Sequence, residues 1–236
     1  LQEGGAMVVQ RRTKREAAER GTGGDFDKLT CAEARTLAGM TPMQEVCNAI
    51  SMLAPCLVCA YVWFALPHLG TRGPRTALLT IGMLLHLPFS VAYHLLLARR
   101  ALRDAVANVP RKLDQTFIHV ACVTSTWALS PSAGFAILAS TLNMYFIARL
   151  WSESNTLFER MLNIGLGTFL YCLAGLLHGE YAVFFYGGSW FLAGAAIMVA
   201  HVGGWGHSIM HVCIGGVAFQ CLMAASRIQS GDHPLW

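Results

Sequence analysis

The sequence predicts an all-α, polytopic membrane protein, a bundle of seven transmembrane helices. Its composition, the length of its apolar segments and the placement of its basic residues each support this fold class. Of 236 residues, 55% are hydrophobic and 13% are charged, whereas a soluble domain carries about twice that charged fraction. The mean hydropathy is +0.47. Lipid rather than water is therefore the main solvent expected for this chain.

The apolar segments define the expected helices. A helix needs about 20 apolar residues to cross the hydrocarbon core. Such windows occur roughly at 46–66, 77–98, 114–130, 133–150, 161–178, 181–201 and 207–226. The letters SPS between the third and fourth windows predict a tight hairpin. We expect three parts in the chain: a basic N-terminal tail at 1–44, a seven-helix transmembrane domain at 45–227 and a C-terminal tail at 228–236.

Lysine and arginine are distributed unevenly across the seven expected spans. Fourteen of the 17 fall on the side of the N-terminus, and three, Arg72, Arg75 and Arg227, fall on the other side. Because basic loops are retained on the cytoplasmic side, the N-terminus is expected to face the cytoplasm or the matrix of an organelle. These residues flank apolar segments, so they indicate orientation and do not predict nucleic-acid binding.

The N-terminal tail allows two interpretations. It is rich in arginine and the chain begins with Leu1 rather than methionine. A processed organelle-targeting remnant and a simple cytosolic tail both agree with this composition. Of the eight cysteines, most lie inside apolar segments. Cys56 and Cys59 form a CxxC pair within one expected helix, and they are interpreted as packing residues rather than as a metal or redox site.

Histidines from separate spans are expected at one depth of the membrane. His94 lies near the end of the second span, whereas His207 and His211 open the seventh, all on the N-terminal side. At 1.5 Å per residue, His94 and His211 both lie about 6 Å inside the boundary. The i,i+4 spacing places His207 and His211 on one helix face. Because unpartnered imidazoles are unfavourable in hydrocarbon, the three histidines predict a zinc site with a fourth position for water.

Other polar residues are expected beside these histidines. Asp114 opens the third span on the same side, and it could hold the metal-bound water and accept its proton. Ser90, one turn before His94, could polarise a carbonyl group or bond that water, or it could bond its own helix backbone. His86, two turns before His94, could face the same cavity. The alternative for these histidines is hydrogen bonding between helices without a metal. Packing or interface roles are expected for His119 and His201.

Three short motifs carry a resemblance to a known family. The letters SVAYH at 90–94, KLDQTFI at 112–118 and HSIMHV at 207–212 resemble motifs of the progestin and adipoQ receptor family. That family includes the adiponectin receptors and the hemolysin III-like proteins, and it is grouped with the alkaline ceramidases. The resemblance covers roughly residues 45–226. It implies a seven-helix bundle with zinc surrounded by Ser90, His94, Asp114, His207 and His211, and it implies a lipid amide as substrate.

The chain departs from the family motifs at two positions near Asp114. Pro110 stands where the family often has His or Asn, and Gln115 stands where it commonly has Tyr or His. Two functions remain as hypotheses. The first is a zinc-dependent hydrolase acting on a lipid amide or ester. The second is a non-catalytic subunit of a larger organelle membrane complex, in which zinc clamps the second and seventh helices together. A membrane receptor is a third option, although the outer connections are short.

Overall fold

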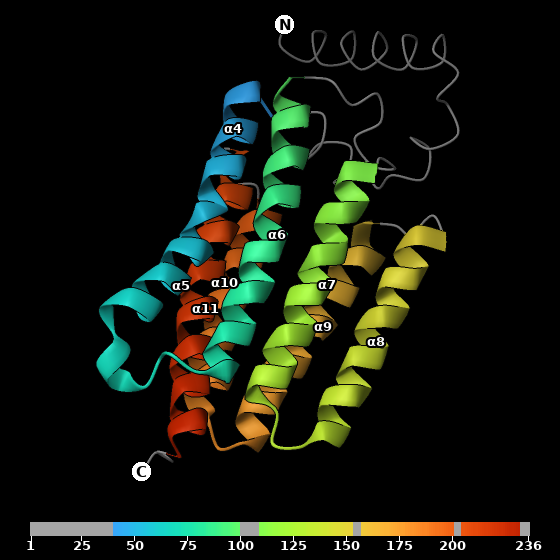
Figure 1. Ribbon diagram of the computed structural model, residues 1–236. Coiled ribbons are helices and arrows are strands. Elements are labelled where there is room, and N and C mark those ends of the chain that lie inside the picture. The colour runs from blue at the N-terminus through green and yellow to red at the C-terminus, as the bar shows by residue number, and fades with distance from the viewer. Residues whose placement is uncertain (1–39, 100–108, 153–156, 201–203, 232–236) are drawn as a thin grey trace, which may run out of the picture. The chain divides into compact units, whose positions relative to one another are not determined.

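The computed structural model describes residues 40–99, 109–152, 157–200 and 204–231. Within these ranges all regular secondary structure is helical, and successive helices run up and down the bundle (Figure 1). The elements are α4 (Pro42–Ser51), α5 (Leu53–Ala65), the short 3₁₀-helix η1 (Pro67–Leu69), α6 (Pro74–Ala98), α7 (Val109–Leu129), α8 (Ala133–Ser152), α9 (Leu157–Leu177), the π-helix η2 (Val183–Gly187), α10 (Gly188–Val199) and α11 (Gly206–Ser230). With α4 joined to α5, and η2 to α10, these form seven helical segments.

Five of the seven segments are long and apolar enough to cross a membrane. They are Pro42–Ala65, Pro74–Ala98, Ala133–Ser152, Phe158–Leu177 and Gly206–Ser230. The prediction of an all-helical, multi-pass membrane protein is thus confirmed. Helices also lie within the two remaining predicted spans, 114–130 and 181–201, but α7 carries many polar side chains and the apolar helix Val183–Val199 is shorter. Seven crossings therefore remain a prediction.

The first span begins and is interrupted for local reasons. The Thr41 hydroxyl accepts a hydrogen bond from the Gln44 backbone N–H (3.3 Å), and the Gln44 side chain accepts one from the Thr41 N–H (2.8 Å). This reciprocal capping box starts α4. The helix is interrupted after Ser51, four residues before Pro55. A proline has no N–H and its ring clashes with the carbonyl four residues earlier, which explains the break.

The turn between α7 and α8 has the predicted hairpin form. α7 ends at Leu129 and α8 begins at Ala133, so three residues connect the two helices. The Ser130 hydroxyl donates a hydrogen bond to the Ser132 carbonyl oxygen (2.7 Å), and the Ser132 hydroxyl accepts one from the Phe135 N–H (3.3 Å). The bond to Phe135 satisfies a backbone N–H that the start of α8 leaves without a helical partner.

The central helix of the bundle is α11. Of its apolar window, 56% is buried, more than in any other of the five candidate spans, and it packs against α4, α5, α6, α7 and α10. A Cβ atom on Gly206 would lie 2.6 Å from the carbonyl oxygen of Ile197 in α10. Because Gly206 directly precedes His207, the close contact between α10 and α11 also determines where the two α11 histidines enter the bundle.

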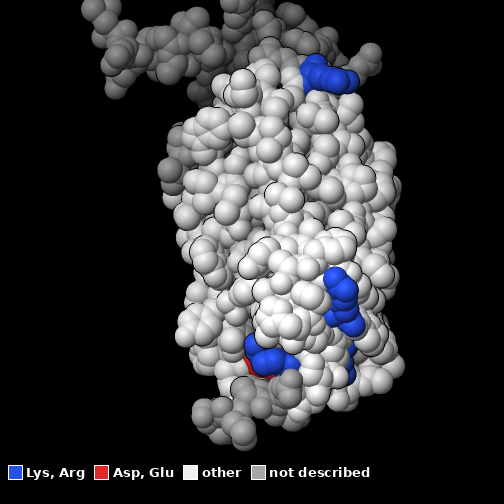
Figure 2. Space-filling view, turned by 60° about the vertical axis from the view of Figure 1, so that its left-hand side comes forward, with Lys and Arg blue, Asp and Glu red and all other residues white. Residues whose placement is uncertain are grey.

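A large apolar cluster fills the core, and buried polar side chains lie between the helices beside it. Leu79, Leu129 and Leu222 are among the largest fully buried side chains. Cys56 and Cys59 are buried free thiols on α5, and Cys59 belongs to the main apolar cluster, in agreement with a packing role. The outer face shown in Figure 2 is uncharged over its broad middle, with basic side chains toward its two ends. A lipid-facing surface has this distribution.

Candidate metal centre

Three histidines meet inside one end of the bundle. His94 comes from α6, whereas His207 and His211 come from the first turns of α11. One ring nitrogen of each residue lies within 4.8 Å of those of the other two. The ring centroids are 4.9 Å apart for His94 and His207, and 4.5 Å apart for His207 and His211. The predicted ligands thus come together, and the cluster could hold a metal ion.

The His94 ring is oriented by a carboxylate. Its Nδ1 lies 2.8 Å from Oε2 of Glu45 on α4. An ionised carboxylate only accepts hydrogen bonds, so Nδ1–H is the donor and the lone pair is on Nε2. Among the described residues, that buried Nε2 atom has no hydrogen-bond partner. An unpaired acceptor in a protein interior costs free energy, and a metal ion at this position would satisfy it. The hydrogen bond between α6 and α4 thus accounts for Nδ1 of His94 but not for its Nε2.

The His211 ring is oriented in the same way by backbone and side-chain oxygens. Its Nδ1 lies 3.1 Å from the carbonyl oxygen of Asn48 and 2.8 Å from the hydroxyl oxygen of Ser51. The Ser51 hydroxyl donates its own proton to the Asn48 carbonyl (2.9 Å). Nδ1–H of His211 is therefore the donor to these oxygens, and Nε2 carries the lone pair. Metal-binding histidines commonly have their second nitrogen fixed by such bonds.

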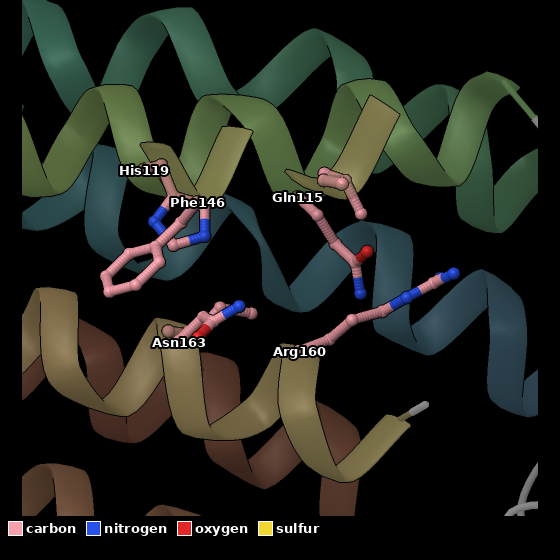
Figure 3. Close-up of a pocket in the computed structure, with 7 residues that line it drawn as sticks. Gln115, His119, Phe146, Arg160 and Asn163 are labelled. Carbon is pink, nitrogen blue, oxygen red and sulfur yellow. The ribbon is translucent and has the colours of Figure 1, made fainter. Parts of the chain in front are cut away.

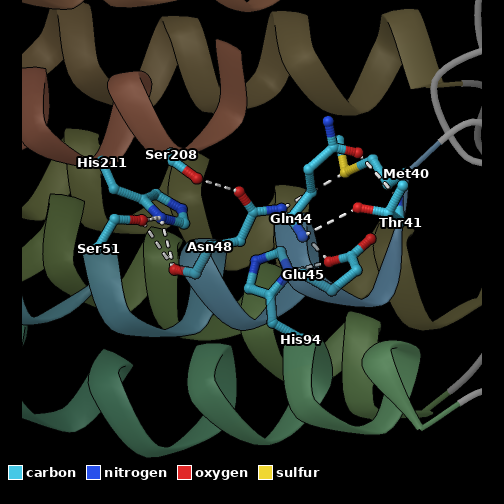
Figure 4. A network of polar contacts seen from close by, with 9 residues as sticks. All are labelled: Met40, Thr41, Gln44, Glu45, Asn48, Ser51, His94, Ser208 and His211. Carbon is cyan, nitrogen blue, oxygen red and sulfur yellow. Dashed lines mark hydrogen bonds and ion pairs between the residues drawn. The ribbon is translucent and has the colours of Figure 1, made fainter. Parts of the chain in front are cut away.

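Asn48 links Glu45, which orients His94 on α6, to Ser208 at the start of α11, as Figure 4 shows. Its side-chain N–H donates to Oε2 of Glu45 (3.3 Å), and its Oδ1 accepts a hydrogen bond from the hydroxyl of Ser208 (2.6 Å), the residue after His207. Asn48 is fully buried. One short helix, α4, therefore positions both the α6 histidine and the start of α11.

Sequence analysis did not identify Glu45, Asn48 and Ser51 as site residues. The three polar residues are spaced by three along α4, within a segment that is apolar enough to span a membrane. A glutamate at the start of such a span indicates a polar site, because a buried carboxylate there requires a partner. The sequence did not show that His94, 49 residues later, is this partner.

The donor set agrees with a transition-metal site. Tetrahedral coordination with Zn–N bonds of about 2.0–2.1 Å would bring the three nitrogens to about 3.3 Å from one another. Small rotations of the side chains would close the cluster to this size. Imidazole ligands suit zinc, copper, iron and nickel, so the residues define a metal site without specifying the ion.

Asp114 and Ser90, the two residues with predicted catalytic roles, lie next to the cluster. Asp114 Oδ1 is 2.9 Å from Nε2 of His86, and the Ser90 side chain is a hydrogen-bonding neighbour of the same carboxylate. Asp114 also lies close enough to His94 and His207 to interact with both electrostatically. The catalytic roles of Asp114 and Ser90 remain predictions.

A second polar region lies between α7, α8 and α9 (Figure 3). The small cavity there is lined by Gln115, His119, Phe146, Leu150, Arg160, Asn163 and Ile164. His119 Nδ1 is 2.9 Å from Oδ1 of Asn143, so His119 links α7 to α8. This agrees with the interface role expected for it. His201 lies outside the described residues.

Comparison with family models, with curated proteins and with solved structures finds no match for this chain. The resemblance to the progestin and adipoQ receptor family therefore rests on the three short motifs. What the fold and the site define together is a class: a multi-pass helical membrane protein with a buried cluster of three histidines that could hold a metal ion.

Proposed function

We propose that this protein is a zinc-dependent hydrolase that acts on an amide or ester bond of a membrane lipid. The observation that supports the proposal most directly is the buried Nε2 of His94. It has no hydrogen-bond partner in the described part of the chain, and it belongs to a cluster with His207 and His211. Three histidine ligands leave one position open on a tetrahedral zinc ion, as in catalytic rather than structural zinc sites.

The residues around the cluster supply the other requirements of hydrolysis. When bound, zinc lowers the pKa of a water molecule and polarises a carbonyl group. In this proposal the Asp114 carboxylate accepts a proton, and the nearby Ser90 adds a hydroxyl group. The cluster lies toward the end of the bundle at which α11 begins. A site near the membrane surface suits the amide or ester linkage of a lipid, which lies close to the headgroup.

The motif resemblance points to the same chemistry. Its three motifs contain Ser90, His94, Asp114, His207 and His211. By that resemblance the substrate would be a lipid amide similar to ceramide. The departures at Pro110 and Gln115 lie near Asp114, so they bear on the substrate class and on activity rather than on the metal ligands.

The proposal is tested by metal analysis of the purified protein together with lipid turnover. One zinc ion per chain and hydrolysis of a ceramide or a related lipid ester are expected. Asp114→Asn should retain zinc, and it should lower turnover by about 10²–10⁴-fold because an amide cannot act as the general base. Protein that carries zinc but hydrolyses no lipid amide or ester would contradict the proposal.

A structural role for the metal is the second candidate. Hydrogen bonds from His94 on α6 and His211 on α11 to oxygens of Glu45, Asn48 and Ser51 connect both helices to α4. A metal within this network would clamp three helices together, as a non-catalytic subunit of a larger membrane complex could require. For a clamp, Asp114→Asn should change stability alone, by about 1–3 kcal/mol for a disturbed buried hydrogen bond. Turnover and thermal unfolding of the same variant therefore separate the two functions.

A further inference from the structure

His86 lies on the face of α6 that carries Ser90 and His94. The three residues are spaced by four, and residues with this spacing lie one above another on a helix. His86 is two turns from His94, about 12 Å along the helix at 1.5 Å per residue. It is therefore too far along α6 to join the metal cluster directly, and it is not among the three clustered residues.

The contact that His86 makes is with Asp114 on α7. Its Nε2 is 2.9 Å from Oδ1 of the carboxylate, and the two side chains are 12% and 13% exposed. An ionised carboxylate has no proton to donate, so Nε2–H of His86 is the donor. Hydrogen bonds of this kind are stronger than neutral ones because one partner is charged. Most of the contact is shielded from solvent, so water does not replace it easily.

The Asp114 carboxylate is thus held from the α6 side by the N–H of His86, and the Ser90 hydroxyl lies beside it. A carboxylate offers about four acceptor positions. One of them serves His86, and others remain for a group near His94 and His207, with which Asp114 interacts electrostatically. Without His86 the Asp114 side chain would be free to rotate away from the cluster.

We propose that His86 is a positioning residue that orients Asp114 toward the metal cluster. The inference rests on the proposed function, because it assigns His86 a part in the same site. The proposal adds a residue to the metal ligands and the general base. The site then extends two helical turns from His94 toward the middle of α6. A residue that acts only through Asp114 should have no effect once Asp114 cannot serve as a base.

A double-mutant cycle on the full-length, zinc-loaded protein tests this dependence. The variants are His86→Leu, Asp114→Asn and the two combined, with kcat and KM measured on a fluorescent ceramide in detergent micelles. His86→Leu should lower kcat by about 10- to 100-fold, the usual effect of removing a supporting hydrogen bond, with KM and zinc content unchanged. His86→Gln, which retains an N–H donor, should restore part of the loss. In the Asp114→Asn background, His86→Leu should change kcat by no more than about twofold.

His119→Leu is the matched control. His119 is a buried histidine on α7 that also makes one side-chain contact of 2.9 Å, to Asn143, and not to Asp114. It should leave kcat within about threefold of wild type, since distant sites act independently. An equal loss in His86→Leu and His119→Leu would overturn the proposal, because it would indicate a general packing effect. The same factor for His86→Leu in both backgrounds would overturn it as well.

A second readout does not depend on turnover. Cobalt(II) in place of zinc gives visible absorption bands that respond to its ligands and their neighbours. His86→Leu and Asp114→Asn should alter these bands alike, and the double variant should show no further change. If cobalt binds but no lipid is hydrolysed, the proposed function fails and the spectra still decide the role of His86. Spectra of His86→Leu that match wild type would refute the positioning role.

Discussion

The contact between Glu45 and His94 gives the most direct test of the metal centre. The two side chains are 2.8 Å apart, with 10% and 3% of their surfaces exposed. Glu45→Gln preserves the size of the side chain and removes its charge. A metal ion on Nε2 makes the opposite N–H of the imidazole a stronger donor, so the carboxylate stabilises the metal-bound state more than the empty one. Hydrogen bonds to charged groups contribute about 1.5–3 kcal/mol.

That range corresponds to a loss of about 10- to 100-fold in zinc affinity, at 1.36 kcal/mol for each factor of ten. Competition with a chromophoric chelator in detergent solution measures the affinity. Glu159→Gln is the control, because it also removes one carboxylate but its partner is Arg149, 3.9 Å away, and its side chain is 42% exposed. Zinc affinity in Glu45→Gln within about twofold of wild type would refute the assignment of Glu45 as the support of a metal-binding His94.

Three further predictions follow from the same structure. The double variant His207→Ala, His211→Ala should lose its zinc, since it removes two of the three ligands; full retention in elemental analysis would exclude the cluster as the zinc site. Gly206→Ala should lower thermal stability by about 1–3 kcal/mol through overpacking against α10, and it should also weaken zinc binding. Gly188→Ala is the control and should do neither, because a Cβ atom on Gly188 would meet no atom within 4 Å. With Cys31 as the single remaining cysteine, an impermeant thiol reagent should label it only from the cytoplasmic or matrix side, as the basic residues predict; labelling from the opposite side would reverse the orientation.

Local sequence features determined the helices and the identity of the clustered histidines. Apolar windows and proline turns depend on neighbouring residues, so they can be recognised along the chain. Alternating helix directions then placed His94 and His211 at one depth, and the structure brings them together with His207. The α7 segment shows where hydropathy is insufficient. Its buried polar side chains, among them Asp114, Gln115 and His119, face other helices, so this helix does not resemble the five apolar spans.

Only the tertiary structure decided which residues support the cluster. Helical periodicity places residues on a face of their own helix, but packing determines which neighbour that face meets. Glu45 and His94 are 49 residues apart, and Ser51 and His211 are 160 apart. The pairing of His86 with Asp114 likewise depends on the contact between α6 and α7. The sequence by itself therefore predicts the histidines of the candidate metal site, whereas the orientation of their rings and of Asp114 depends on how the helices pack.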